Sequence, residues 1–588
     1  MEVPFRSTRT GLPLGAWILI AVSLNILLAT GGGYGWDVGA WAHWVDDLQV
    51  GGYAAQSATY PPLFVHWLWL CGKLLTLLQL TTHSAALLRF LVVTPVLVCQ
   101  VLLLLLTEQL SRAQPDAERI GWLSGFVALN PALLIDGPLW GQVDLIHCLM
   151  LVYTLHLLIA GRYLILVLPL LMLAVLTKFQ SICLLPVLLP LLWRRRCASL
   201  WRGAIPALLL AELALLPYWL AGTAVSMLRE AYVHASSLYP NASMNADNLW
   251  YLLGLNMVND SLPLFNPALL PAGLGWLLTP RILGEGLFIL WSLWLLFSTW
   301  RADQAEYYWR NAMLSALGFF LLLPDMHERY LFPAVVLALV AAAQYARFAR
   351  HAVALSVLTA LNILLVLELR HDGPLPYVIS AVLLAYGLCW LGWPLLARLP
   401  LRRLEALPLW VWMVATLLVW VLALTVHVER ALPAAAPPAS TLQAAPPSGI
   451  EPVDATRIPG RTSTQGWGSL HIGQSVEGNT LSVAGKTWPE GFGTHAPSII
   501  HMPVPPHAAR FTASVGVDDE AHGGRVAFQV FADRQKIWDS GAIDSGEAPH
   551  AVDLDVTGRV TLDLVVDPLG DNSYDHADWL QPRFVFGR

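Results

Sequence analysis

The sequence predicts a polytopic α-helical membrane protein followed by an all-β sandwich. Of its 588 residues, 56% are hydrophobic and only 13% are charged, whereas a soluble globular protein carries about 25% charged residues. Apolar runs fill the chain up to residue 430, and short stretches of alternating apolar and polar residues follow from about residue 465. We therefore exclude a purely soluble enzyme and divide the chain into a membrane part (1–430), a linker (431–464) and a β domain (465–588).

The membrane part contains about fourteen apolar segments, although several are shorter than the roughly 20 residues that a membrane-spanning helix needs. Counting crossings from the N-terminus and from the basic clusters gives results that differ by one between residues 61 and 107. We therefore expect that one segment there, either 61–80 with its Pro61, Pro62 and Lys73 or 84–107, does not fully span and that about 13 crossings remain. The segments lie near 12–30, 61–80, 84–107, 120–135, 143–160, 162–177, 180–193, 203–221, 282–299, 311–323, 330–347, 352–369, 376–397 and 408–428.

Clusters of basic residues orient these helices, because loops rich in Lys and Arg stay in the cytoplasm. The clusters lie at Arg194–Arg196, Arg301–Arg310, Arg347–His351 and Arg398–Arg403. They predict a cytoplasmic N-terminus and place everything after residue 430 outside the cytoplasmic membrane.

The C-terminal part differs from the membrane part in composition. Residues 431–450 are rich in Ala and Pro and predict a semi-rigid spacer. After residue 430 there are 18 acidic and 10 basic residues, a net charge of −8 that argues against nucleic acid as a partner. All six cysteines precede residue 430, so no disulfide framework is expected in the tail.

The first predicted outside loop is acidic and aromatic. It contains Asp37, His43, Asp46 and Asp47 and no Lys or Arg. One interpretation is a solvated acidic loop whose tryptophans lie at headgroup level. The other is a catalytic loop, with Asp37 as its acid.

A second polar cluster lies at or just inside the same membrane face. It contributes Asp136, Gln142 and Asp144. A carboxylate inside a membrane segment costs about 2.5–3.5 kcal/mol, so it is usually retained for function. The alternative is a turn and helix cap at Asp136, which precedes Gly137 and Pro138.

Three further polar features are expected at the outer face. Lys178 interrupts an apolar stretch of about thirty residues. It is either a cation for a phosphate or for a buried carboxylate, or a side chain that snorkels to the interface. The run DMHERY brings His327, Glu328 and Arg329 into one short turn, either as a phosphate-binding cluster or as a polar loop. Asn248 and Trp250 end an amide-rich loop. Together these groups suit a site that binds a lipid-anchored phosphate and a polar substrate.

The order of these motifs resembles the integral-membrane GT-C glycosyltransferases, and among them the dolichyl-phosphate-glucose-dependent glucosyltransferases of asparagine-linked oligosaccharide assembly. The resemblance covers roughly residues 10–370. The chain departs from the family at two places. In the family an Asp precedes the segment Tyr-Pro-Pro-Leu, whereas this chain has Thr59 there. Residues 139–144 read Leu-Trp-Gly-Gln-Val-Asp, whereas the family has His-Phe-Gln-Tyr-Asn.

The resemblance implies inverting transfer from a polyprenyl-phosphate sugar, with Asp37 as the catalytic base. It implies that the donor phosphate is bound near Lys178, His327, Glu328 and Arg329. We assign substrate binding to the remaining candidates of the membrane part, which are His43, Asp136, Gln142, Asp144, Asn248 and Trp250.

The tail resembles the NPCBM module, a carbohydrate-binding domain of galactose-binding-like jelly-roll fold. Three runs carry this resemblance: GTHA at 493–496, GVDD at 516–519 and DHADW at 575–579. We expect an exposed Trp to stack against a sugar ring and polar groups to bind its hydroxyls, although these residues could instead only stabilise the module. The expected carbohydrate-binding residues are His495, Asp518, Asp519, Asp575, His576, Asp578 and Trp579.

The sequence thus predicts a membrane glycosyltransferase with a glycan-binding tail. Its partners would be a polyprenyl-phosphate sugar, a lipid-linked or cell-surface glycan and membrane lipid. The alternatives are a glycolipid transporter or flippase and a membrane-anchored glycan sensor. No cofactor or metal is required for catalysis. A structural Ca²⁺ in the tail remains an option, because carboxylates suit this ion.

Overall fold

The structure, a computed structural model, falls into two compact units, Met1–Ala431 and Leu432–Arg588. Each unit is described by itself. The residues that the structure describes are 12–30, 35–55, 58–78, 85–114, 122–233, 240–264, 277–367, 374–390, 453–457, 462–465, 470–505, 507–521, 523–533, 535–569 and 574–586.

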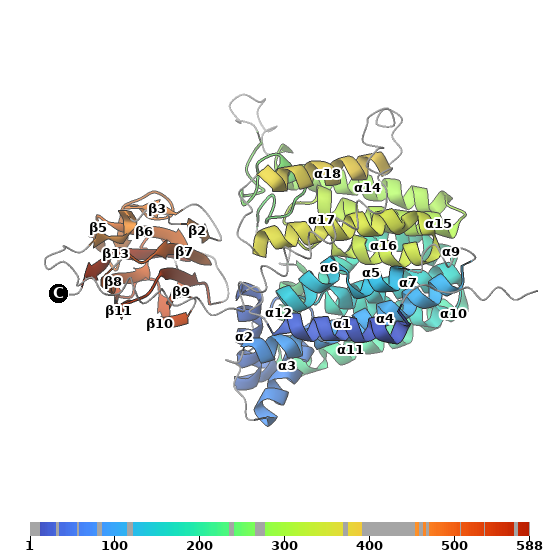
Figure 1. The fold of residues 1–588 in the computed structure, drawn as a ribbon, viewed down its shortest axis with the longest axis horizontal. Helices are drawn as coiled ribbons and strands as arrows, with labels where there is room; N and C mark the ends of the chain where they lie inside the picture. The colour runs from blue at the N-terminus through green and yellow to red at the C-terminus, as the bar shows by residue number, and fades with distance from the viewer. Residues whose placement is uncertain are drawn as a thin grey trace, which may run out of the picture. The chain divides into compact units, whose positions relative to one another are not determined.

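Most of the described residues of the first unit are helical, and its long helices lie side by side (Figure 1). The helices are α1 (Leu14–Ala29), α2 (Gly35–Val50), α3 (Pro62–Leu77), α4 (Ala85–Arg112), α5 (Leu123–Ala128), α6 (Pro131–Leu134), α7 (Asp144–Ala160), α8 (Val167–Thr177), α9 (Leu185–Arg194), α10 (Ala198–Arg202), α11 (Ala204–Ala221), α12 (Ala224–Leu228), α13 (Leu249–Leu252), α14 (Pro280–Arg301), α15 (Ala305–Leu322), α16 (Phe332–Gln344), α17 (Ala349–Leu367) and α18 (Pro374–Trp390).

Several of these helices have the length and composition of membrane spans. Among the described residues, four helical segments are long and apolar enough to cross a membrane: Leu87–Arg112, Ala198–Ala221, Pro280–Arg301 and Ala346–Leu367. Seven shorter apolar helices accompany them, including Pro62–Leu77. The structure thus has the apolar helices expected of a multi-pass protein without fixing the number of crossings, and the predicted helix at 408–428 lies outside the described residues.

The burial of the helices distinguishes interior from peripheral positions. In the spanning window of α17, 83% of the residues are buried, whereas the corresponding share is 17% for α14. The residues that α14 leaves uncovered are large and apolar, for example Leu290 and Leu293. An exposed apolar surface of this extent is typical of a face that contacts lipid.

The loops before and after α15 lie at opposite ends of this helix. α15 packs against both α14 and α16. Its C-terminus leads into the loop 323–331, while its N-terminus follows the short turn 302–304. With 18 residues and a rise of about 1.5 Å per residue, α15 separates these loops by about 27 Å, nearly the thickness of a bilayer core.

The second unit is a β sandwich of two antiparallel sheets and a hairpin (Figure 1). One sheet has the order β11-β8-β13-β6-β3 with β1 against β13, the other has the order β10-β9-β12-β7-β2, and β4 pairs with β5. The strands are β1 (Val453–Asp454), β2 (Thr462–Gln465), β3 (His471–Ile472), β4 (Leu481–Val483), β5 (Lys486–Trp488), β6 (Gly491–His495), β7 (Ser498–Pro503), β8 (Ala508–Val517), β9 (Arg525–Ala532), β10 (Gln535–Asp544), β11 (His550–Asp555), β12 (Thr561–Asp567) and β13 (His576–Phe586).

The sandwich has its own hydrophobic core, formed by the inward faces of the two sheets. Along β12, buried Leu562, Leu564 and Val566 alternate with partly exposed residues, as the period of two in the sequence predicts. β1 and β2 belong to this sandwich, so its strands begin within the range 431–464 that the sequence analysis assigned to the linker.

Candidate functional site

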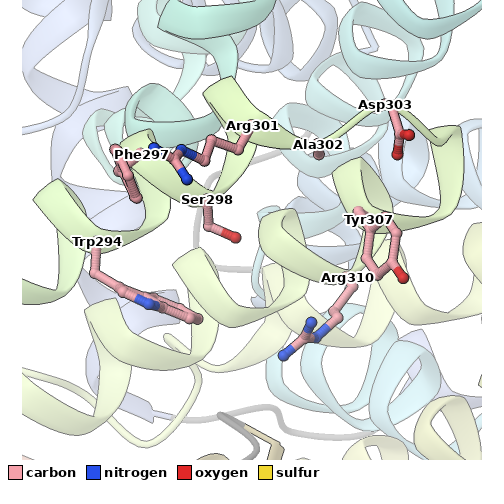
Figure 2. A pocket seen from close by; sticks show the side chains of 8 residues that line it. All are labelled: Trp294, Phe297, Ser298, Arg301, Ala302, Asp303, Tyr307 and Arg310. Carbon is pink, nitrogen blue, oxygen red and sulfur yellow. The ribbon is translucent and has the colours of Figure 1, made fainter.

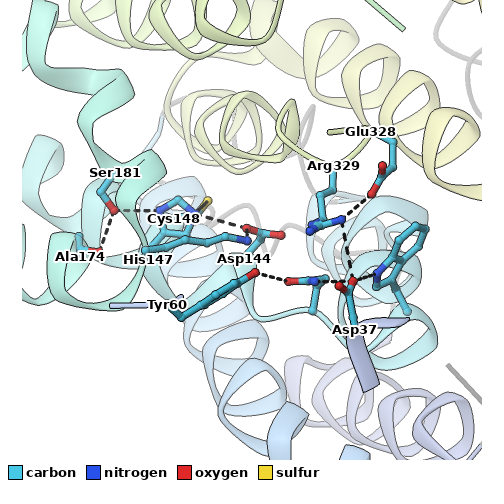
Figure 3. A network of polar contacts seen from close by, with 12 residues as sticks. Asp37, Tyr60, Asp144, His147, Cys148, Ala174, Ser181, Glu328 and Arg329 are labelled. Carbon is cyan, nitrogen blue, oxygen red and sulfur yellow. Dashed lines mark hydrogen bonds and ion pairs between the residues drawn. The ribbon is translucent and has the colours of Figure 1, made fainter. Parts of the chain in front are cut away.

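Asp37 is the centre of a polar cluster in the helical unit (Figure 3). Its Oδ2 accepts hydrogen bonds from Trp140 Nε1 at 2.5 Å and from Gln142 Nε2 at 2.7 Å. Arg329 Nη1 lies 3.9 Å from the same oxygen. The side chain remains 21% exposed. Because all of these contacts use Oδ2, the other carboxyl oxygen accepts no hydrogen bond from a described residue.

The backbone after α6 explains how Trp140 and Gln142 reach Asp37. A π-helical turn, Ile135–Trp140, ends at Gly141, whose φ of 108° is disfavoured for any residue with a Cβ. Trp41 of α2 donates from its Nε1 to the Gly141 carbonyl at 3.3 Å. This contact fixes the turn against the helix that carries Asp37.

Arg329 links Asp37 to the loop between α15 and α16. Its Nη1 also contacts Glu328 Oε1 at 2.6 Å. Its guanidinium carbon lies 5.8 Å from the ring centre of Trp140 and 5.7 Å from that of Tyr330. Arg329 is therefore held by one carboxylate of its own loop and lies against two aromatic rings.

A second ionic cluster contains Asp144 and His147 (Figure 3). Lys178 Nζ contacts Asp144 Oδ1 directly. His147 Nε2 lies 3.7 Å from the same oxygen, and both side chains of the Lys178–Asp144 pair are at most 4% exposed. Lys178 interrupts the helix after Thr177 with an extended backbone, so its side chain leaves the helical register.

Aromatic and amide groups connect the two clusters. Tyr60 donates from its hydroxyl to Gln142 Oε1 at 3.5 Å, and Gln142 in turn donates to Asp37. Lys178 Nζ lies 5.6 Å from the ring centre of Tyr60 and 5.8 Å from that of Tyr330. The structure thus brings Asp37, Gln142, Asp144, Lys178 and Arg329 into one network, although they are spread over almost 300 residues of sequence.

Asp136 lies beside this network and is 1% exposed. Neither of its carboxyl oxygens accepts a hydrogen bond from a described residue. It interacts electrostatically with Asp144, Lys178 and Arg329. It is therefore a second buried acid close to the two cations.

The other predicted residues of the membrane part have different positions. His327 is paired through its backbone with Met244, and its Nδ1 lies 3.9 Å from Glu328 Oε2. Asn248 caps α13 by accepting from the backbone amides of residues 250 and 251. Trp250 is buried and donates to the Leu322 carbonyl at 3.0 Å. These contacts give Asn248 and Trp250 a structural role, and the side chain of His43 lies outside the described residues.

Four residues of the network have no role predicted from the sequence, namely Tyr60, Trp140, His147 and Tyr330. Each lies within three positions of a residue or motif that was singled out. His147 follows Asp144 by three positions on a helix, which places both on one face. The signal for the aromatic residues was weaker, because aromatic side chains are common throughout this chain.

Three of the four predicted carbohydrate-binding acids of the tail, Asp518, Asp575 and Asp578, are buried, whereas Asp519 is partly exposed. Asp518 accepts from the backbone amides of Ser482 and Glu520, and Asp519 accepts from the hydroxyl of Ser482. Asp578 is 0% exposed. Burial and the neighbouring Asp518 raise its pKa well above the usual aspartate range.

The expectation of an exposed Trp in this cluster is wrong, because Trp579 is 0% exposed. It lies on the central strand β13 and packs edge to face against Phe528, with ring centres 5.2 Å apart. A tryptophan in the core cannot stack against a sugar ring.

The two histidines and Asp575 of the predicted tail site are also at most 5% exposed. His495 and His576 lie with ring centres 5.4 Å apart, and His576 Nδ1 contacts Glu520 Oε1 at 2.9 Å. Burial lowers the pKa of His495 to about 4. Asp575 accepts from the backbone amide of Arg525. Among the described residues, no group of three or more His, Cys, Asp or Glu side chains is placed to hold a metal ion.

We expect Asp578→Asn to make the stability of the tail domain less dependent on pH. A raised pKa means that the folded domain retains a proton which the unfolded chain releases. The stability contributed by protonated Asp578 is therefore complete below about pH 4 and decreases as pH rises toward the raised pKa, by up to about 1.4 kcal/mol per pH unit.

Chemical denaturation of residues 450–588 at pH 6.5–9 tests this expectation, since His495 is neutral in both states over most of this range. The free-energy difference between Asp578→Asn and wild type should grow in favour of the variant as pH rises. The exposed Asp544→Asn should stay within about 0.5 kcal/mol of wild type at every pH. A constant difference across this range would show that Asp578 is ionised in the folded domain.

Comparison with known protein families assigns the tail. Residues 452–585 match the NPCBM/NEW2 domain, which confirms the predicted NPCBM module. The chain is 38% identical over 118 residues to alpha-1,3-galactosidase B of Akkermansia muciniphila, which covers 19% of this chain and 15% of that protein. The chain therefore spans well under two thirds of this curated relative.

Two solved structures are also similar. CBM51 from Clostridium perfringens GH95, in complex with methyl-galactose, covers 23% of this chain and all of that chain, with 28% identity and a TM-score of 0.22. The arabinosyltransferase EmbB from Mycobacterium smegmatis covers 99% of this chain and 66% of that chain, with 13% identity and a TM-score of 0.36.

Proposed function

We propose that this chain is an integral-membrane inverting glycosyltransferase. It transfers a sugar from a polyprenyl-phosphate donor to an extracytoplasmic glycan or a lipid-linked acceptor. Its tail binds glycan. The protein resides in the cytoplasmic (inner) membrane as a multi-pass protein, with the N-terminus inside and the tail outside.

The observation that carries the proposal is the pairing of a partly exposed carboxylate with two buried cations. Asp37 holds one carboxyl oxygen against Trp140 and Gln142 and leaves the other without a donor among the described residues. Lys178 and Arg329 lie in the same network. This combination supplies both a base and positive charge for a leaving phosphate.

The proposed reaction is a single displacement at the anomeric carbon. The unpaired oxygen of Asp37 takes the proton of the acceptor hydroxyl as the acceptor oxygen bonds to the anomeric carbon. The bond between that carbon and the phosphate oxygen breaks, and its electron pair leaves with the polyprenyl phosphate. The proton then passes from Asp37 to solvent.

In the proposed inverting reaction, the base and the leaving group lie on opposite sides of the anomeric carbon, and we assign them to different parts of the network. Asp37 belongs to one cluster. Lys178 belongs to the other, together with Asp144 and His147. We propose that Lys178 stabilises the charge of the leaving phosphate. We place Arg329, which lies beside Asp37, between the base and the phosphate.

The tail is proposed to hold the acceptor glycan near the membrane. The NPCBM match supports this proposal, as does the methyl-galactose complex of the similar CBM51. Because Asp518, Asp575, Asp578 and Trp579 are buried, the glycan would contact the partly exposed Asp519 or other exposed residues of the sandwich. A glycan array with residues 450–588 identifies the sugars.

The donor class can be tested with the purified full-length chain in nanodiscs. A panel of polyprenyl-phosphate hexoses and pentoses is incubated with glycan acceptors, and free polyprenyl phosphate is measured by mass spectrometry. We expect acceptor-dependent release from one donor, and none when a nucleotide sugar is the only donor. Absence of release from every donor, together with movement of labelled glycolipid across proteoliposomes, would favour a transporter.

A further inference from the structure

A pocket lined by both charged and apolar side chains lies at the N-terminal end of α15 (Figure 2), and the loop that carries Arg329 follows the C-terminal end of the same helix. The pocket has a volume of about 360 Å³ and lies between the C-terminal part of α14 and the N-terminal part of α15. α15, about 27 Å long, separates the turn 302–304 beside the pocket from the loop that carries Arg329. The lining residues are Trp294, Phe297, Ser298, Arg301, Ala302, Asp303, Tyr307 and Arg310.

The charged groups of the pocket favour an anion. Arg301 and Arg310 contribute two guanidinium groups, from different helices, and exposed Asp303 contributes one negative charge. Arg301 lies over the ring of Phe297, 4.5 Å from its centre. The Ser298 hydroxyl accepts from Asn311 Nδ2 at 3.1 Å and can still donate its own proton. Planar guanidinium groups match the oxygens of a phosphate.

A neighbouring helix adds positive charge next to the pocket. Arg194, at the C-terminus of α9, donates to the carbonyls of Trp300 and Ala302. Arg194 thereby pairs these two carbonyls at the C-terminus of α14. Without this pairing they would be hydrogen-bond acceptors with partial negative charge beside the pocket.

An apolar stripe on α14 leads to Arg301. Leu287, Leu290, Trp294 and Phe297 are 36–66% exposed, and their spacing of three, four and three residues places them on one face of the helix. Arg301 follows Phe297 by four residues and continues the same face. From Leu287 to Arg301 the stripe measures about 21 Å, which exceeds the roughly 15 Å depth of one hydrocarbon leaflet.

We propose that this pocket binds the phosphodiester headgroup of an anionic phospholipid whose acyl chains lie along the stripe on α14. Basic pockets between membrane helices recognise such headgroups. Arg301 and Arg310 bind the phosphate oxygens, and the exposed apolar residues contact the chains. The proposal requires that the helical unit is embedded in a membrane, but it does not depend on the glycosyltransferase reaction.

The test uses the full-length chain in detergent and measures lipid binding by native mass spectrometry. We expect saturable binding of phosphatidylglycerol and much weaker binding of phosphatidylcholine. Arg301→Gln should weaken phosphatidylglycerol binding about tenfold, since one charge-assisted phosphate contact is lost. The control Arg202→Gln removes an exposed arginine at the end of α10 and should leave binding unchanged.

Two further arms decide whether a lipid is the ligand. A photoactivatable phosphatidylglycerol should label the peptide 287–310 of the wild-type chain, which requires no variant to fold. Glycerol phosphate should not compete at the same concentration. Equal binding by wild type and Arg301→Gln, or labelling elsewhere, would overturn the proposal. Full competition by glycerol phosphate would show a site for free phosphate instead.

Discussion

Replacing Asp37 by Asn should reduce sugar transfer by about 10²–10⁴-fold while the protein stays folded in the membrane. The expected loss is that of general-base assistance, because an amide cannot take the acceptor proton. The amide oxygen of Asn can still accept from Trp140 and Gln142. Arg329 keeps its contact with Glu328 Oε1 at 2.6 Å, so no buried cation loses its partner.

The measurement is the initial rate of polyprenyl phosphate release by purified variants at matched concentration. Asp46→Asn is the matched control, since it makes the same change on the same helix and should retain the wild-type rate. Near-normal release by Asp37→Asn would contradict the assignment of the base. Asp136 and Asp144, the other acids close to Lys178, would then be tested in the same way.

Lys178→Met should have the largest effect on stability. The change leaves Asp144, which is 4% exposed, without its cation, and only His147 at 3.7 Å remains beside the same oxygen. Removing one partner of a buried ion pair costs about 3–5 kcal/mol. We therefore expect low yield and a much lower unfolding temperature.

The double variant Lys178→Met/Asp144→Asn separates stability from catalysis. It removes both charges, so most of the lost stability should return, because a buried pair replaced by neutral groups is often nearly neutral in free energy. Transfer should stay low, because the proposed phosphate contact is absent. Thermal unfolding in detergent, followed by tryptophan fluorescence, measures the first effect.

Lys73→Met is the control for this series, because Lys73 is exposed on α3 and should contribute within about 0.5 kcal/mol. A single variant as stable as wild type would show that Lys178 and Asp144 do not form a buried pair. A stable double variant with full activity would remove Lys178 from the proposed mechanism.

The class of each part of this protein was determined by the sequence. Apolar runs such as 84–107 and 282–299 predict helices because a helix satisfies all of its backbone hydrogen bonds in lipid within one continuous apolar segment. The helices α4 and α14 occupy these ranges. The alternation in 561–567 predicts a strand because one face of a sandwich is buried, and β12 has this pattern.

Tertiary structure decided which polar residues meet and which side chains reach the surface. The partners of Asp37 are 103 and 105 positions away, and Arg329 comes from a loop almost 300 positions away. No local pattern encodes such distances, because they depend on helix packing and on the turn at Gly141. The burial of Trp579 has a related reason. Strand alternation identifies two faces, but tertiary packing buries both faces of β13 near this residue, Trp579 in the core of the sandwich and Leu580 against the β4–β5 hairpin.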